Sequence, residues 1–176
     1  MGVFAVVVFF SDALGRVLIF DRTAILHGAA WRVWTGNVVH FGPSHLLWNL
    51  AVFVPAGIWL ERITPRAARC LLALSPALVG ATMLVFQPAL DRYAGLSGVA
   101  AGVLALLAFT QLTRPRGDHW FWWSVLVLLT LKVCAEAFSD HALLARFSEP
   151  GLHAAPLAHV AGIAGALMVH AWSRRI

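Results

Sequence analysis

A serine and a histidine that could act as nucleophile and base lie in different apolar segments of this 176-residue chain. Ser97 stands in the sequence Gly95-Leu96-Ser97-Gly98, and His159 stands near the start of the last apolar segment. A serine hydroxyl is a weak nucleophile and needs a base within about 2.6–3.2 Å to take its proton. The two residues therefore predict acyl transfer, provided that the fold brings them together.

Two further polar residues, His45 and Asn49, could stabilise the oxyanion of such a reaction. They are four residues apart, so a helix places them one turn apart on one face. A helix beginning at Ser97 would add free backbone N–H groups and a positive potential. Gly95 and Gly98 let the chain and a substrate approach each other closely.

The composition places these residues in a membrane protein. Apolar residues make up 60% of the chain, charged residues 12%, and the mean hydropathy is +0.79, whereas soluble domains average roughly 45–50% apolar and about 25% charged. A soluble enzyme and a disordered chain are therefore excluded. The basic residues are scattered arginines with one lysine, which argues against a nucleic-acid partner. Cys70 and Cys134 form no motif of a disulfide framework or a zinc site.

Six apolar stretches approach the length of about 20 residues that a helix needs to cross a bilayer, and the alternation of a β-barrel is absent. We predict an all-α fold, a polytopic six-transmembrane-helix bundle forming one domain over residues 1–176. The expected helices are 2–20, 45–60, 67–86, 97–112, 120–138 and 154–172. The first lacks the basic start of a signal peptide and is expected to be retained, with Asp12 and Arg16 close enough to pair.

The arginines predict the orientation, because basic residues favour the cytoplasmic side. With the N-terminus inside, seven lie in inner segments: Arg62, Arg66, Arg69, Arg114, Arg116, Arg174 and Arg175. Four lie in outer segments and are offset by acids: Arg22, Arg32, Arg92 and Arg146, against Asp21, Asp91, Asp140 and Glu149. Both termini are therefore expected inside.

In that orientation the polar residues of the second, fourth, fifth and sixth expected spans lie in the outer half of the membrane. The span 97–112 is short, since 16 residues rise only roughly 24 Å, so Ser97 should lie in a water-filled cavity below the outer surface. Lys132 and Glu136 are four apart in the fifth span and are expected to form an ion pair or to contact the cavity. Two interpretations of this pair stay open: it fixes the span against its neighbours, or it grips polar groups of a substrate.

Small residues predict which spans pack closely. Gly98 and Gly102 form one small face, and Ala158, Gly162 and Gly165 form another. Packing is the more economical interpretation of these glycines. Such packing would also bring His159 to Ser97.

The motifs together resemble the rhomboid family of intramembrane serine proteases, and within it the rhombosortase branch. The matching residues, from about Trp31 to Trp172, are Trp31-Arg32, His40, His45-Leu-Leu-Trp-Asn49, Gly95-Leu96-Ser97-Gly98 and His159-Val-Ala-Gly162-Ile-Ala-Gly165. The compact size and the Lys132–Glu136 pair resemble rhombosortases rather than typical rhomboids. One position departs from the pattern: Ala101 stands where many rhomboids have a tyrosine, and rhombosortases often a histidine, against which the catalytic imidazole packs.

The resemblance implies a six-helix protease with a Ser97–His159 dyad and no third acidic member. It also implies an oxyanion site made by the Ser97 N–H, His45 and Asn49, and no metal or organic cofactor. The implied substrates are proteins anchored by a single span in the lipid bilayer and cut near its outer end. For rhombosortases these carry a C-terminal Gly-Gly sorting signal, a hydrophobic helix and a basic tail, which implies a bacterial inner membrane.

Three other functions fit parts of the sequence. A haem protein needs facing histidine pairs at mid-helix, whereas His45 and His159 lie near helix ends. An ion transporter or proton relay would use Lys132, Glu136 and the histidines, but the sequence shows no internal repeat. A catalytically inactive rhomboid-like chaperone is disfavoured by the intact serine and histidine.

Overall fold

The computed structural model describes residues 1–115, 117–139 and 155–175. Arg116, Asp140, Arg146 and Glu149, which enter the prediction of orientation, lie outside these residues, as does the expected start of the last span at residue 154. The elements in chain order are α1 (Gly2–Phe9), α2 (Asp12–Leu18), β1 (Phe20–Asp21), α3 (Arg22–Leu26), α4 (Arg32–Thr35), a 3-10 helix (Gly36–Val38), α5 (Pro43–Ile63), α6 (Pro65–Phe86), β2 (Arg92–Tyr93), α7 (Ser97–Leu112), α8 (His119–Ser139) and α9 (Pro156–Ser173).

The five long helices α5 to α9 confirm five of the predicted helices. The bounds of α7 are those predicted, and α5, α6 and α9 each begin with a proline, which suits the first turn because its missing N–H has no helical acceptor there. Helices α5, α6 and α8 are long and apolar enough to cross a membrane, and α7 is a shorter apolar helix. These helices support an integral membrane protein, but the count of six spans is not confirmed.

The expected first helix over residues 2–20 is wrong as a single element. The structure divides it into α1 and α2, with a break at Phe10 and Ser11. The Ser11 hydroxyl accepts a hydrogen bond from Leu14 N and caps the second helix, so a new helix starts there. A hydropathy pattern shows where apolar residues lie, but it does not show that Ser11 caps a second helix. Asp12 and Arg16 form no ion pair in the described structure.

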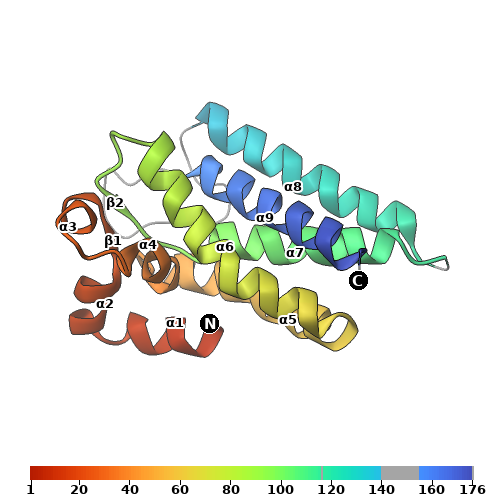
Figure 1. Ribbon diagram of the computed structural model, residues 1–176, viewed down its shortest axis with the longest axis horizontal. Coiled ribbons are helices and arrows are strands. Elements are labelled where there is room, and N and C mark those ends of the chain that lie inside the picture. The colour runs from red at the N-terminus through yellow and green to blue at the C-terminus, as the bar shows by residue number, and fades with distance from the viewer. Residues whose placement is uncertain (116, 140–154, 176) are drawn as a thin grey trace.

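The long helices lie side by side, and α5, α7 and α9 run in the same direction (Figure 1). Helix α7 is central, since most of its residues are buried. Its closest neighbour is α9: a Cβ at Gly102 would lie 2.6 Å from the carbonyl oxygen of Gly162, and one at Gly98 would lie 2.7 Å from that of Ala158. The small faces therefore let two backbones touch, which confirms the predicted packing of these helices.

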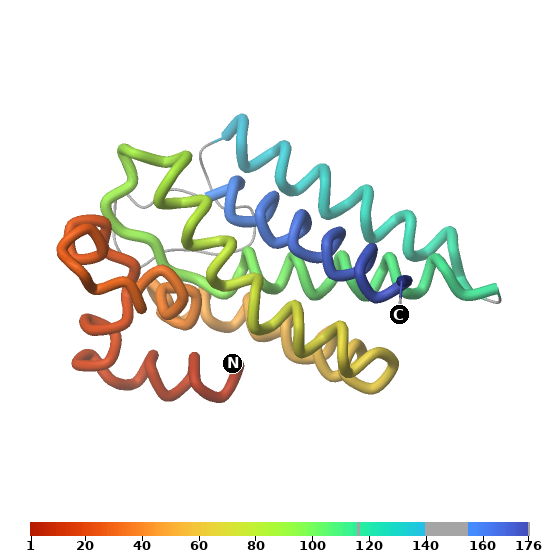
Figure 2. Tube along the Cα trace, viewed as in Figure 1, coloured from red at the N-terminus to blue at the C-terminus, as the bar shows by residue number. Residues whose placement is uncertain are grey.

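The connector before α5 is tied to the segment before α7 (Figure 2). Strands β1 and β2 pair antiparallel, with Phe20 opposite Tyr93. The Arg22 guanidinium donates hydrogen bonds of 2.7–3.0 Å to backbone carbonyls at the end of α6 and beyond, those of Met83, Leu84, Gln87 and Leu90. Met83 O and Gln87 O also accept backbone hydrogen bonds from Gln87 N and Leu90 N, so the arginine adds to the capping of the α6 C-terminus and fixes the loop that leads to Ser97.

Candidate active site

Ser97 is the first residue of α7 and follows a glycine in a conformation that other residues rarely adopt. Gly95 has φ +131°, and a Cβ there would lie 2.7 Å from both Cε1 and Nε2 of His45. The first helical hydrogen bond joins Ala100 N to Leu96 O at 2.8 Å. The N–H groups of residues 97–99 therefore have no helical acceptors and are available to an anion. Gly95 is needed because other residues rarely adopt its positive φ, and because a side chain there would collide with His45.

His45 and Asn49 meet this loop from α5, as the sequence predicts. The Phe41 N–H donates to His45 Nδ1 at 3.4 Å, so the proton of the neutral ring is on Nε2, the nitrogen that faces Gly95. Asn49 is buried, and its Nδ2 has no hydrogen-bond partner within the described structure. A buried donor without an acceptor costs about 1–3 kcal/mol and calls for an explanation. An acceptor that arrives with the substrate would supply one.

His40 supports the same loop from behind. Its Nε2 accepts a hydrogen bond from Leu96 N at 3.4 Å, and its Nδ1 donates to Val38 O at 3.3 Å. Burial, reinforced by neighbouring His45, lowers the pKa of His40 to about 3. The ring is therefore neutral near pH 7, which the bond from Leu96 requires because a protonated Nε2 could not accept.

This contact predicts that the fold loses stability in acid. The pKa of His40 is about 3 in the folded protein against 6.5 ordinarily, so between these values the unfolded chain binds the extra proton. The free energy of unfolding contributed by His40 is complete above pH 6.5 and falls with pH by at most about 1.4 kcal/mol per unit. We expect His40→Gln, which does not titrate, to flatten the decline in thermal stability between pH 7 and 5. An unchanged slope would contradict the role of His40.

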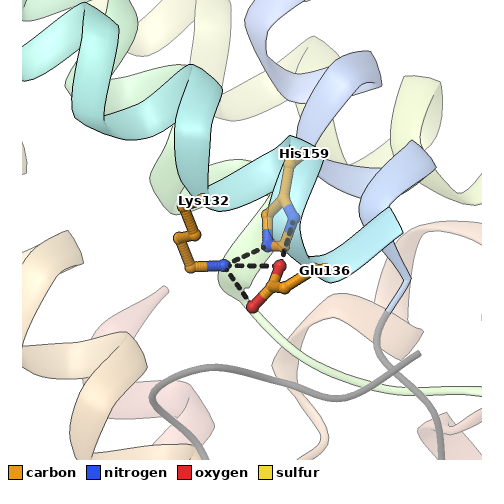
Figure 3. A network of polar contacts seen from close by, with 3 residues as sticks. All are labelled: Lys132, Glu136 and His159. Carbon is orange, nitrogen blue, oxygen red and sulfur yellow. Dashed lines mark hydrogen bonds and ion pairs between the residues drawn. The ribbon is translucent and has the colours of Figure 1, made fainter. Parts of the chain in front are cut away.

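His159 on α9 is held by the pair on α8. Its Nδ1 lies 3.3 Å from Glu136 Oε2, within ion-pair distance but without the alignment of a hydrogen bond, and its Nε2 lies 3.5 Å from Lys132 Nζ (Figure 3). Lys132 Nζ lies 2.7 Å from both carboxylate oxygens of Glu136. The expected ion pair is confirmed, whereas its contact with His159 was not predicted.

The structure brings the chain neighbours of Ser97 and His159 into contact but does not join the two side chains. They adjoin Gly98 and Ala158, where the two helix backbones meet. In the part of the chain that the structure describes, no hydrogen bond links their side chains, and the Ser97 hydroxyl interacts with Tyr93 instead. Catalytic hydrogen bonds are often long before substrate binds and shorten in the complex with substrate.

Tyr93 is a residue of the site that the sequence reasoning missed. Its hydroxyl donates to Gly95 O at 3.1 Å, and burial raises the pKa of this phenol. The phenol is therefore neutral, and its hydrogen bond to Gly95 O stabilises the turn before Ser97. The chain has a single tyrosine, but nothing in its neighbouring residues marks it. Only the pairing of β1 with β2 brings it to the site.

The alanine at position 101 leaves the His159 imidazole without an aromatic ring to pack against in the described structure, and other contacts replace that ring. Ala101 is buried in α7, and no aromatic ring stacks on His159 among the described residues. The imidazole is instead in contact with the carboxylate and the ammonium of α8. Polar contacts therefore hold the histidine where a ring is usual.

The comparisons with known proteins identify the family of the chain. No curated protein matches the chain. A family model, described as Rhomboid domain, matches residues 27–175 and so includes every residue of the site. Because this match covers most of the chain, including the glycine turn, the serine helix and both donors of α5, the protein belongs to the rhomboid family, whose members are generally intramembrane serine proteases.

Proposed function

We propose that this protein is an active intramembrane serine protease in which Ser97 is the nucleophile and His159 the base. Ser97 Oγ forms a bond to the scissile carbonyl carbon while its proton passes to His159 Nε2. The tetrahedral intermediate then collapses, the C–N bond breaks, and His159 returns the proton to the leaving amine. Water then attacks the acyl-enzyme carbonyl and gives one proton to His159, which passes it to Ser97 Oγ as the ester bond breaks, while the other proton leaves with the carboxylic acid product.

The observation that carries this proposal is the set of hydrogen-bond donors around the start of α7. Among the described residues Asn49 Nδ2 is buried without a hydrogen-bond partner, His45 Nε2 carries a proton toward Gly95, and the first N–H groups of α7 have no helical acceptors. An oxyanion is the acceptor that such a group stabilises most. A purely structural role for Asn49 would not explain why its Nδ2 donor has no acceptor in the described structure.

We further propose the substrates and the orientation. The substrates are single-span membrane-anchored proteins of the rhombosortase type, with a C-terminal Gly-Gly signal, a hydrophobic helix and a basic tail. The N-terminus and the C-terminus lie in the cytoplasm, and the site opens to the outer side of a bacterial inner membrane. The arginines of the described inner segments support this orientation, because Arg62, Arg66 and Arg69 cluster where α5 meets α6.

A reporter protein with such a tail tests the substrate and the orientation together. Co-expression with the wild-type chain should release the reporter on the outer side, and a tail whose Gly-Gly pair is replaced by Leu-Leu should stay uncut. The small residues are expected to matter because they let the substrate helix unwind into the site. Equal cleavage of both tails would contradict the substrate class, and release into the cytoplasm would contradict the orientation.

A further inference from the structure

The contact between α8 and α9 suggests a role for a residue that a serine–histidine dyad does not include. We infer that Glu136 is a positioning residue for His159: its carboxylate accepts the Nδ1 proton of the imidazole and thereby leaves Nε2 unprotonated for Ser97. Lys132 holds the carboxylate in place. This inference rests on the proposed function, since it assigns a role within the same reaction.

The distances define which nitrogen carries the proton. Lys132 Nζ, a donor only, lies 3.5 Å from Nε2, so this nitrogen presents its lone pair. The proton of the neutral ring is then on Nδ1, which lies 3.3 Å from Glu136 Oε2. Rotation of the ring that aligns this proton with the oxygen would complete the hydrogen bond. The base of the reaction needs this tautomer, because Nε2 must accept the proton from the serine.

Burying the Glu136 carboxylate costs free energy, which argues against a purely structural role for it. The Glu136 side chain is 2% exposed and that of Lys132 is 26% exposed, on a helix apolar enough to cross a membrane. Replacing a buried ion pair with apolar residues is often neutral or stabilising, so the pair is better explained by what it contacts. The titratable groups that act on His159 are Glu136 and Lys132 from α8 and His45 from α5. Of these, only the carboxylate favours the imidazolium that forms during catalysis.

The alanine at position 101 is the second reason to assign Glu136 the role of positioning His159. With no ring stacked on His159 in the described structure, the histidine needs another partner to fix its rotation. Glu136 and Lys132 reach both of its ring nitrogens. In the reaction, the Ser97 hydroxyl replaces Lys132 at Nε2, while Glu136 remains at Nδ1.

Substitutions of the pair test the inference on the full chain in detergent. We expect Glu136→Gln to lower kcat by about 10²–10⁴-fold with little change in KM, and to slow labelling of Ser97 by a fluorophosphonate in parallel. Glu136→Asp, which keeps the charge, should retain activity within about tenfold of the wild type. Glu61→Gln is the matched control: it removes a carboxylate from an exposed ion pair with Arg69 on the helices α5 and α6, and should change neither quantity.

The double variant Lys132→Met/Glu136→Gln separates positioning from folding, because it leaves no unpaired buried charge. We expect it to unfold near the wild-type temperature and yet to remain as slow as Glu136→Gln. Nitrogen-15 NMR of the His159 ring should show the proton on Nδ1 in the wild type and a changed tautomer in both variants. Recovery of activity in the double variant, or a wild-type proton on Nε2, would overturn the inference.

The two proposals fail in different ways. If Ser97→Ala cleaves as well as the wild type, the proposed protease is wrong. If cleavage depends on Ser97 but Glu136→Gln keeps wild-type kcat, the protease stands and only the role of Glu136 is wrong.

Discussion

Replacing Ser97 with alanine should abolish cleavage of a membrane-anchored substrate while the protein still inserts and accumulates. His159→Ala should have the same effect, because nucleophile and base act as a unit. In serine proteases the loss of either costs about 10⁶-fold in kcat, which in a cell-based assay is no detectable product. The measurement is the ratio of cut to uncut reporter on an immunoblot.

The matched control for this prediction is Ser124→Ala. Ser124 is exposed on α8, and its hydroxyl donates to Trp120 O at 2.8 Å within its own helix. Its removal should leave cleavage at the wild-type level. Cleavage near the wild-type rate in Ser97→Ala would show that the nucleophile is elsewhere.

The second large effect is expected at Asn49, where rate and stability should separate. Asn49→Ala removes a buried donor that has no partner in the described structure. It should lower kcat by about 10²–10³-fold, the usual cost of one oxyanion donor. It should change the free energy of unfolding little, because no hydrogen bond of Nδ2 is lost. The two quantities are measured by peptide-bond cleavage and by thermal unfolding in detergent.

Asn37→Ala provides the opposite case. Asn37 is fully buried, and its Nδ2 donates to Trp34 O and Pro76 O, each at 3.0 Å. Its loss should lower the free energy of unfolding by about 1–3 kcal/mol. If Asn49→Ala behaves like Asn37→Ala, losing stability rather than rate, then Asn49 is a structural residue and not an oxyanion donor.

Much of the fold could be predicted because the helices are long and apolar. The bounds of α7 and the close packing of α7 on α9 follow from hydropathy and glycine spacing, and His45 with Asn49 follows from helical period. The break at Ser11 could not be predicted in this way, because one capping hydroxyl in an apolar run does not alter the hydropathy.

The parts of the site that the sequence did not reveal depend on the rotation and pairing of separate elements. Lys132 and Glu136 could be paired from their spacing, but which helix they face depends on how α8 packs against α9. Tyr93 reaches the glycine turn only because β1 and β2 pair. Neither relation has a signal in the residues next to these positions.

Covalent labelling tests whether Ser97 is a nucleophile that His159 activates. Purified protein is treated with a fluorophosphonate, and the modified residue is identified by mass spectrometry. We expect a single adduct on Ser97 in the wild type and none in His159→Ala, because the hydroxyl then has no base. An adduct on another residue, or labelling of Ser97 at the wild-type rate in His159→Ala, would contradict it.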